Sequence, residues 1–200
     1  MLEDEPSPRL RLTGSAVGGT HRYYSMQKDE QNPNEMKVHL SLGSNIGDRE
    51  GYLRAAINRL RTLPDTELAA VSDLYLCDPV GPDVDGYFLN MVVYIDTKMD
   101  IEELHKKLVE IERELGKKKE GGNGNRTIDI DVIFADDLEG EYDGLVIPHP
   151  LYSQRDFVLL PLMDISHTLG TARVSDVRRH LDREKGDDRP LCIRYKSMVY

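Results

Sequence analysis

The fold is decided by the stretch 37–48, KVHLSLGSNIGD. Its first six residues alternate between polar and apolar side chains, which is typical of a half-buried β-strand. A turn-rich loop follows, and Asp48 is then a suitable N-cap for a helix whose apolar residues recur at positions 53, 56, 57 and 60. A domain therefore begins near Met36 with a strand, a loop and an amphipathic helix that ends at Pro64.

The chain continues to alternate between strands and helices. Residues 68–77 and 88–97 are rich in Val, Tyr and Ile and predict two strands, separated by a loop with two prolines and two glycines. Asp100, with a glutamate three residues later, begins a second amphipathic helix that ends at Gly116, and a strand at 127–135 follows. This order of elements predicts an α+β fold: a ferredoxin-like antiparallel sheet with a βαββαβ core and helices packed on it.

Length and composition limit the class of protein. The chain has 200 residues, of which 39% are hydrophobic and 31% charged, as expected for one globular domain. We expect residues 37–200 to form that domain. Residues 1–36 have sparse, aperiodic hydrophobic side chains and predict a flexible N-terminal extension. The net charge of −10 argues against a general affinity for nucleic acid or for an anionic membrane.

The cysteines and the hydropathy bear on the cellular location. Cys77 and Cys192 have neither a CxxC motif nor a disulfide-dense spacing, which fits a reducing compartment. No apolar run approaches the roughly 18 residues of a membrane span, and the N-terminus lacks the pattern of a signal peptide. We therefore expect a cytoplasmic protein that does not insert in a membrane.

Two aspartates are the strongest chemical signal. In the stretch 128–134, IDIDVIF, the two-residue period sends Asp129 and Asp131 to one face, with Cα atoms roughly 6.6 Å apart. The same period sends Ile128, Ile130, Val132 and Phe134 to the other face. A partly covered pair of like charges needs protons, arginines or a cation, and Mg²⁺ is the natural choice because it prefers one or two carboxylates plus phosphates and water. The alternative is an exposed acidic strand face without a metal.

Basic residues flank this pair in an otherwise acidic chain. A cation held by carboxylates and surrounded by positive side chains suits a polyphosphate, whose oxygens complete the coordination. Taken singly, the lysines could be a solvated loop, the histidine a structural residue and the last arginine a surface ion-pair partner. The basic residues are Lys117, Lys118, Lys119 and Arg126 before the pair, and His149 and Arg155 after it.

A small aromatic set offers a second kind of site. Phe88 and Phe157 are two of only three phenylalanines, and Asn90 lies two residues after the first of them. An aromatic ring can stack on a flat heterocycle while a planar amide reads the edge of that heterocycle. The alternative is that both rings are ordinary core residues and that the amide is satisfied within a turn.

Several motifs, in order and with their spacing, resemble one enzyme family. They are LSLGSNIGDR at 40–49, DPVGP at 78–82 with FLN at 88–90, IERELG at 111–116, RTIDID at 126–131, and PHP at 148–150 with Arg155 and Phe157. The chain resembles the 6-hydroxymethyl-7,8-dihydropterin pyrophosphokinases of folate biosynthesis from about residue 37 to residue 165. The resemblance implies transfer of pyrophosphate from ATP to the pterin, with AMP and the pterin diphosphate as products.

The resemblance also implies roles for individual residues. Asp129 and Asp131 would hold two Mg²⁺ ions and, with Arg126, form the catalytic centre. A monomer would act on two small substrates. ATP would be contacted by Glu112, Lys117, Lys119, Arg126, His149 and Arg155, and the pterin by Val80, Phe88, Asn90 and Phe157.

The chain departs from the family pattern in one loop. Lys117 and Lys119 stand where the family commonly has arginines, and GNGNR at 122–126 replaces a run such as RWGPR, apparently with one residue fewer. Lysine lacks the bidentate fork of arginine, so we expect a less specific clamp on phosphate.

Two other classes remain as alternatives. The same order of elements occurs in RNA-recognition domains, but these need aromatic and basic side chains on the open sheet face, where this chain has carboxylates. A Mg²⁺-dependent phosphohydrolase could use the same aspartate pair. It would release phosphate from ATP without a pterin, whereas the transferase forms AMP only when the pterin is present.

Overall fold

The sheet is built around β1 (Met36–Ser44), which pairs along its whole length with β4 (Phe88–Thr97). The computed structural model describes residues 35–80, 84, 86–117, 124–183 and 190–198. The remaining strands are β2 (Thr66–Val71), β3 (Leu74–Cys77), β5 (Asp129–Ala135), β6 (Gly140–Tyr142), β7 (Leu145–Ile147) and β8 (Cys192–Lys196). The α-helices are α1 (Arg49–Arg61), α2 (Ile101–Glu114), α3 (Asp156–Asp164) and α4 (Thr171–Leu181).

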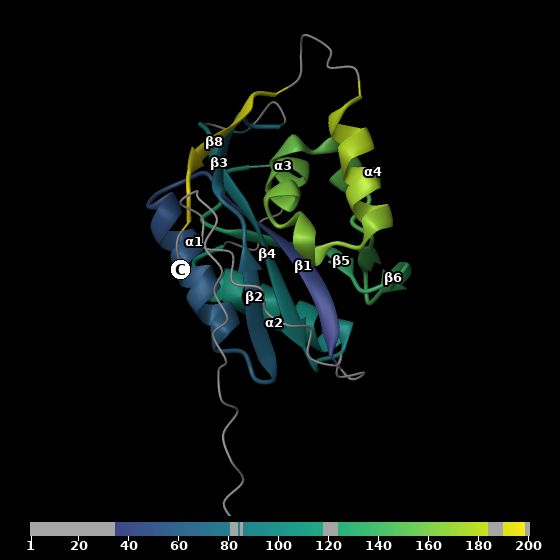
Figure 1. The fold of residues 1–200 in the computed structure, drawn as a ribbon. Helices are drawn as coiled ribbons and strands as arrows, with labels where there is room; N and C mark the ends of the chain where they lie inside the picture. Colours follow the sequence, from purple (N-terminus) through teal and green to yellow (C-terminus); the bar gives the residue numbers. More distant parts are fainter. Residues whose placement is uncertain (1–34, 81–83, 85, 118–123, 184–189, 199–200) are drawn as a thin grey trace, which may run out of the picture. The chain divides into compact units, whose positions relative to one another are not determined.

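The strand order of the main sheet is β5-β1-β4-β3-β8, and β2 also pairs with β4. All of these pairings are antiparallel. The predicted ferredoxin-like core is therefore confirmed, and β5 and β8 form the two edges of the sheet path (Figure 1). A separate two-stranded ribbon, β6 with β7, follows β5.

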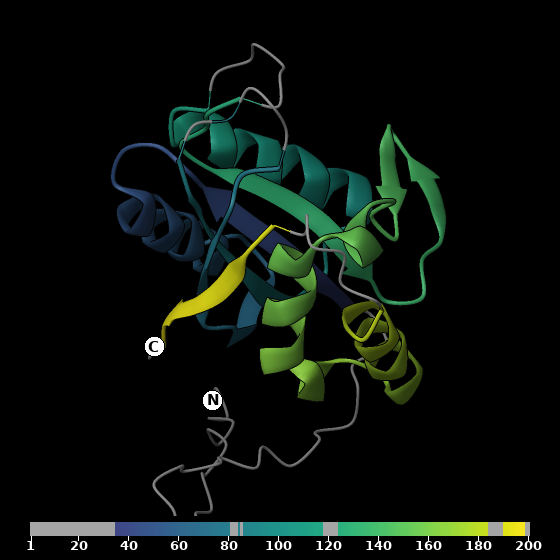
Figure 2. The ribbon, with the colours of Figure 1, turned by 90° about the horizontal axis from the view of Figure 1, so that it is seen from above.

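Helices cover both faces of the sheet. Leucines and isoleucines of α1 and α2 pack on one face in a cluster with Leu40, Leu42 and Met91. On the other face, α3 and α4 pack in a second cluster with Val92 and Phe134. Figure 2 shows the two helix pairs on opposite sides of the sheet. Each sheet face is therefore partly covered, and any site on a face lies beside a helix pair.

The predicted helix ends are confirmed. The carboxylate of Asp48 accepts a hydrogen bond from the N–H of Gly51 at 3.0 Å, and that of Asp100 accepts one from the N–H of Glu103 at 2.7 Å. Gly116 has φ of 87°, a left-handed conformation that glycine adopts without a steric penalty and that ends α2.

The predicted strand 68–77 is wrong in its continuity, because it divides into β2 and β3 at Ser72. The N–H of Ser72 donates to the carbonyl of Val92, and its hydroxyl accepts from the N–H of Val92 at 2.9 Å. A side-chain oxygen thus replaces the backbone acceptor at this position, and the chain leaves the regular ladder.

The predicted facing of Phe134 is also wrong. His39 pairs with Phe134 and Leu40 pairs with Val132, so Ile133 is an extra residue in a β-bulge. The bulge reverses the alternation, and Phe134 packs with α3 and α4 while Ile128, Ile130 and Val132 pack on the opposite face.

The cysteines form a pair that the sequence did not indicate. The β3–β8 register places Cys77 opposite Cys192, and a disulfide joins them across 115 residues of sequence. The lack of a disulfide-dense spacing therefore did not exclude a disulfide, because spacing along the chain does not reveal strand register. Within the described residues, no helix is long and apolar enough to cross a membrane.

The predicted domain boundary stays a prediction. Of the expected N-terminal extension, residues 1–36, only Glu35 and Met36 belong to the described residues, and Met36 is already the first residue of β1.

Candidate active site

One row of cross-strand partners connects the predicted site residues. Asp129 on β5 is opposite Gly43 on β1, and Gly43 is opposite Asn90 on β4. Asn90 is in turn opposite Tyr75 on β3. Cross-strand partners point to the same sheet face, so the acidic pair and the aromatic–amide pair share a face. It is the α3–α4 face, because Val92, two residues beyond Asn90, packs in that cluster.

Asp129 and Asp131 meet as predicted on this face. Burial raises the pKa of Asp131 above its ordinary value, and the negative charge of Asp129 raises it further. The Arg155 guanidinium lies 3.6 Å from the Asp131 carboxylate and opposes this shift in part. Two carboxylates on one sheet face are hard oxygen donors of the kind that a divalent cation such as Mg²⁺ prefers.

Asp129 has two cationic partners. The Lys117 ammonium lies 2.6 Å from Oδ1, and the Arg126 guanidinium lies 3.4 Å from Oδ2. Burial lowers the pKa of Lys117, but the nearby carboxylates outweigh it and hold that pKa above its ordinary value. The ammonium is therefore fully charged at neutral pH.

Glu112 on α2 supports the same strand from behind. It is only 7% exposed, and its Oε1 accepts hydrogen bonds from Lys117 at 2.6 Å and from the N–H of Ile130 at 2.7 Å. Burial raises the pKa of Glu112, while the Lys117 contact lowers it. Because the N–H of Ile130 lies between the two aspartates in sequence, Glu112 fixes the backbone from which both carboxylates project.

His149 and Arg155 lie together beside Asp131. His149 Nε2 is 3.3 Å from Arg155 Nη1, and His149 Nδ1 accepts from the N–H of Leu151 at 3.1 Å. The N–H of His149 donates to the carbonyl of Ile133 on β5, which holds the loop against the strand. Burial lowers the pKa of His149, so a neutral imidazole is favoured.

The Asn90 amide and the Phe88 ring pack against the backbone at Gly43. A Cβ atom at Gly43 would come 2.9 Å from Asn90 Oδ1 and 3.9 Å from the Phe88 ring. The Arg126 guanidinium lies 5.3 Å from the centroid of the Phe88 ring, within cation–π range. The ring, the amide and the guanidinium therefore meet at one position next to Asp129.

Asn45 is a positioning residue that the sequence analysis treated only as part of a tight turn. Its Oδ1 accepts from the N–H of Arg126 at 2.7 Å, and its own N–H donates to the Arg126 carbonyl at 3.2 Å. The GSNIG loop thus fixes the backbone of Arg126. An asparagine between Ser44 and Ile46 in a glycine-bounded loop was the available signal, but its partner lies 81 residues away.

Phe157 and Val80 line a cavity of about 210 Å³ at the other side of Arg155. The Arg155 guanidinium lies 5.4 Å from the Phe157 ring centroid. Pro190, Leu191 and the two cysteines complete much of the wall. A larger hollow of about 450 Å³ at the start of α1 contains none of the predicted site residues.

Unpartnered buried atoms gather at the same place. Among the described residues, four buried side-chain atoms have no hydrogen-bond partner: Ser44 Oγ, Asn90 Nδ2, Arg126 Nε and Thr127 Oγ1. Asn90 Nδ2 and Arg126 Nε are donors beside the Phe88 ring. An unsatisfied buried donor costs on the order of 1–3 kcal/mol, which a ligand with acceptor atoms would recover.

The structure thus brings eleven of the twelve predicted site residues into one connected region. Lys119 lies outside the described residues. Within the described residues, no cluster of three or more His, Cys, Asp or Glu side chains could hold a metal. Two carboxylates are enough for a cation such as Mg²⁺, which usually keeps several water and phosphate ligands.

A ferredoxin-like sheet with paired carboxylates, surrounding cations and an adjacent aromatic–amide pair defines a class: enzymes that transfer phosphoryl groups from a nucleotide to a flat heterocyclic substrate. The family model for 7,8-dihydro-6-hydroxymethylpterin-pyrophosphokinase (HPPK) matches residues 39–167. The chain belongs to this family. Its activity is pyrophosphoryl transfer from ATP to hydroxymethyldihydropterin in folate biosynthesis.

Relatives and a solved structure agree with the family. The 2-amino-4-hydroxy-6-hydroxymethyldihydropteridine pyrophosphokinase of Bacillus subtilis is 42% identical over 128 residues, which are 64% of this chain and 77% of that protein. The enzyme of the same name from Pseudomonas aeruginosa is 35% identical over 133 residues, 66% and 82% of the two chains. The crystal structure of HPPK-DHPS in complex with substrates has a TM-score of 0.52 at 13% identity, covers 75% of this chain and 44% of its own, and supports the fold.

Proposed function

We propose that Asp129 and Asp131 bind two Mg²⁺ ions, which hold and polarise the ATP phosphates when bound. The observation behind this proposal is the row in which Asp129, Gly43 and Asn90 are successive partners. It sets two hard oxygen donors close to the Asn90 amide, which lies so near Gly43 that a Cβ atom there would clash with it, and close to the Phe88 ring. Burial and the negative charge of Asp129 raise the pKa of Asp131, and a bound cation would offset the repulsion between the two carboxylates.

The basic side chains would neutralise the remaining charge of the nucleotide. Arg126, His149 and Arg155 lie on both sides of the aspartate pair, and Lys117 contacts Asp129 directly. We infer that Lys117 exchanges its contact with Asp129 for a phosphate oxygen when the nucleotide binds, while Glu112 keeps the strand in place. Lys119 belongs to the same basic loop and is proposed as a further phosphate contact.

The pterin would bind against Phe88, Asn90, Phe157 and Val80. A pterin ring has several acceptor nitrogens and a carbonyl on its edge, and Asn90 Nδ2 is a buried donor without a partner. Stacking on Phe88 supplies contact area, and the amide sets the orientation of the ring. The Phe157 cavity would receive the opposite face of the ring.

In the proposed reaction the hydroxymethyl oxygen of the pterin attacks the β-phosphorus of ATP, and AMP leaves. The chain contributes alignment and charge neutralisation: Asn90 and Phe88 orient the attacking oxygen, and Arg126 and Arg155 stabilise negative charge on the transferred group. Among the described residues of the site, no activated nucleophile is needed, because the attacking group is the substrate's own hydroxyl.

A monomer would suffice, because the proposed binding residues all come from one chain. We also propose a cytoplasmic enzyme, since ATP is available there. Disulfides are uncommon in that compartment, where thiols are kept reduced. Whether Cys77 and Cys192 are bonded or are free thiols in the working enzyme is therefore to be measured.

AMP formation from ATP and Mg²⁺, with and without hydroxymethyldihydropterin, tests the proposal. We expect AMP only when the pterin is present, and loss of this signal in Asp129→Ala. Asp137→Ala is a matched control, because Asp137 is an exposed acid just after the same strand. Phosphate release without pterin would favour a phosphohydrolase, and full activity of Asp129→Ala would exclude the proposed metal site.

A further inference from the structure

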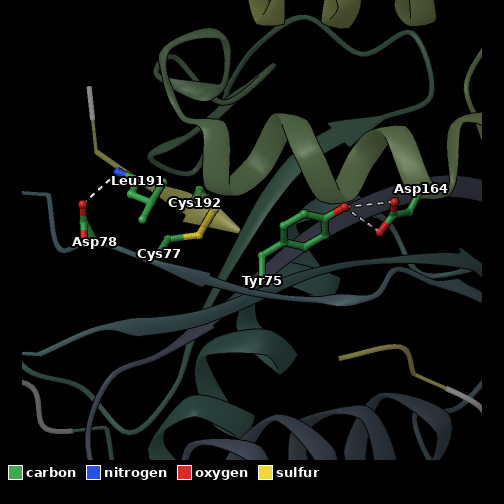
Figure 3. The surroundings of a disulfide bond; sticks show 6 residues. All are labelled: Tyr75, Cys77, Asp78, Asp164, Leu191 and Cys192. Carbon is green, nitrogen blue, oxygen red and sulfur yellow. Dashed lines mark hydrogen bonds between the residues drawn. A yellow bond between two sulfur atoms is a disulfide. The ribbon is translucent and has the colours of Figure 1, made fainter. Parts of the chain in front are cut away.

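The strand β8 lies outside residues 39–167, to which the family model applies, yet it reaches the proposed pterin pocket. Its first residue, Cys192, is bonded to Cys77 at the end of β3 (Figure 3). Next to the disulfide, the N–H of Asp78 donates to the carbonyl of Leu191, and the N–H of Leu191 donates to the Asp78 carboxylate, both at 2.8 Å. Asp78 therefore fixes the segment Pro190–Cys192.

The fixed segment is a wall of the cavity. Pro190, Leu191 and Cys192 line the same 210 Å³ space as Val80 and Phe157. Leu191 is 60% exposed, so its side chain contributes little to the core and is available to a ligand. An apolar side chain that lines the same cavity as an aromatic ring is suited to contact a flat heterocycle.

The disulfide also lies in the same cross-strand row as Phe88, another residue of the proposed pterin site. Cys77 is the cross-strand partner of Phe88 on one side and of Cys192 on the other. The three residues therefore form one row on one sheet face. A shift of Cys77 or Cys192 would be transmitted to the Phe88 ring and to the Leu191 wall together.

The far part of β8 has its own attachments. Arg194 makes ion pairs with Asp164 at 2.7 Å and with Asp73 at 3.2 Å. Lys196 pairs with Glu50 at 2.9 Å. Opening the disulfide would therefore free the end of β8 that faces the cavity while the rest of the strand stays on the sheet.

We propose that the segment Pro190–Cys192 is a substrate-contacting wall of the pterin pocket, held in place by the Cys77–Cys192 disulfide, and that the thiol state of this pair sets the affinity for the pterin. The proposal rests on the proposed pterin site. The oxidised enzyme binds the pterin tightly, and the reduced enzyme binds it weakly, with the ATP site unchanged.

The chemical step is an exchange with a dithiol. A thiolate of the dithiol attacks the sulfur of Cys192, which is the more exposed cysteine, and the thiolate of Cys77 leaves. The second thiol of the reagent then releases Cys192. Two electrons pass to the protein disulfide, the dithiol becomes a disulfide, and its two protons end on Cys77 and Cys192.

The test uses the full chain purified without reductant, before and after treatment with dithiothreitol. Thiol counting should give no free cysteines before treatment and two after it. We expect the KM for pterin to rise about five- to tenfold on reduction, with the KM for ATP and kcat unchanged. Cys77→Ser with Cys192→Ser should behave as the reduced enzyme and not respond to the reagent.

Further variants separate the possible results. Leu191→Ser, with the disulfide intact, should raise the pterin KM, and Lys196→Ala, at the far end of β8, should not. An unchanged pterin KM at complete reduction, or two free thiols in the untreated protein, overturns the inference. If Phe157→Ala also leaves the pterin KM unchanged, the proposed pterin site itself is wrong; if only the redox effect is absent, that site stands and the wall does not.

Discussion

Both edges of the sheet have aspartates with basic partners, but the two sets of contacts differ. At the β5 edge, Asp129 and Asp131 repel each other, and their partners Lys117, Arg126 and Arg155 come from loops. At the β8 edge, Arg194 bridges two aspartates, and the strand is covalently attached to β3. Both edges belong to one row of cross-strand partners, which runs from Asp129 to Arg194.

The difference lies in which partners a ligand could replace. At the β5 edge, a metal or a phosphate can take the place of a lysine or arginine, and unsatisfied donors lie nearby. At the β8 edge, the Asp164 carboxylate accepts from the Tyr75 hydroxyl (Figure 3). It also accepts from the Asp73 N–H and from Arg194. The charged groups at the β5 edge are thus available to a ligand, whereas the charged cluster of Arg194, Asp73 and Asp164 at the β8 edge is satisfied within the protein. Identical substitutions at the two edges should therefore have different effects.

The largest effect is expected from Asp131→Asn. We expect kcat/KM to fall about 10³- to 10⁴-fold, because a proposed metal ligand loses its charge and several kcal/mol of charge stabilisation with it. The free energy of unfolding should stay the same or rise, because the substitution removes the repulsion from Asp129. Steady-state AMP formation and urea unfolding measure the two quantities. If activity and stability fell together, the Asp131 charge would stabilise the fold, and the proposed ligand role would be contradicted.

Loss of the disulfide should have the next largest effect, on stability. Cys77→Ser with Cys192→Ser opens a loop of 115 residues. The chain-entropy model then gives a decrease of about 5 kcal/mol in the free energy of unfolding. kcat should not change, since neither cysteine touches the carboxylate pair. Urea unfolding of the oxidised, reduced and double-serine proteins checks this, and equal stability of all three would show that the β8 edge is not held by the bond.

Local signals made much of the fold predictable. Asp48 and Asp100 cap their helices as predicted, because the cap and its acceptor site lie within three residues of each other. The bounds of β4 were predicted in full at 88–97, where aromatic and branched residues are continuous. These features need no knowledge of which segments become neighbours.

What the sequence could not give depends on register. The bulge at Ile133 turns Phe134 to the other face, and nothing in the alternation of 128–134 marks it. The pairing of Cys77 with Cys192 follows from the position of β8, a strand that was not predicted. Three-dimensional neighbours, not local patterns, decide both features.

The site divides in the same way. The shared sheet face of Asp129 and Asp131 was predicted from a two-residue period. The packing of the Asn90 amide against Gly43 and the hydrogen bond from Arg126 to Asn45 could not be predicted, because each depends on a partner more than 40 residues away in sequence.

A titratable group between the edges tests where the pH dependence of stability arises. His39 on β1 is buried against Tyr94 and Phe134, and burial, with the nearby Arg173 charge, lowers its pKa from 6.5 to about 4. The unfolded chain therefore binds more protons between these values, and stability falls as pH decreases from 6.5 toward 4. The expected loss is up to about 3 kcal/mol.

His39→Gln separates this contribution from that of the carboxylates. Glutamine does not titrate, yet its amide can contact the Thr168 hydroxyl, which lies 2.8 Å from His39 Nε2. Urea unfolding at pH 7 and pH 4.5 should show a smaller loss for the variant than for the unaltered chain. Equal losses in both proteins would assign the acid sensitivity to the edges instead.

The smallest effect is expected from Asp164→Asn, the β8 counterpart of Asp131→Asn. Asp164 only accepts hydrogen bonds, from Tyr75, Asp73 and Arg194, so an amide NH₂ must face at least one donor. We expect a decrease of about 1–2 kcal/mol in the free energy of unfolding, with kcat/KM unchanged. The same pair of measurements applies at both edges. If Asp164→Asn instead reduced activity while preserving stability, the charged cluster around Arg194 would also be a ligand site, and the contrast between the charged groups of the two edges would be lost.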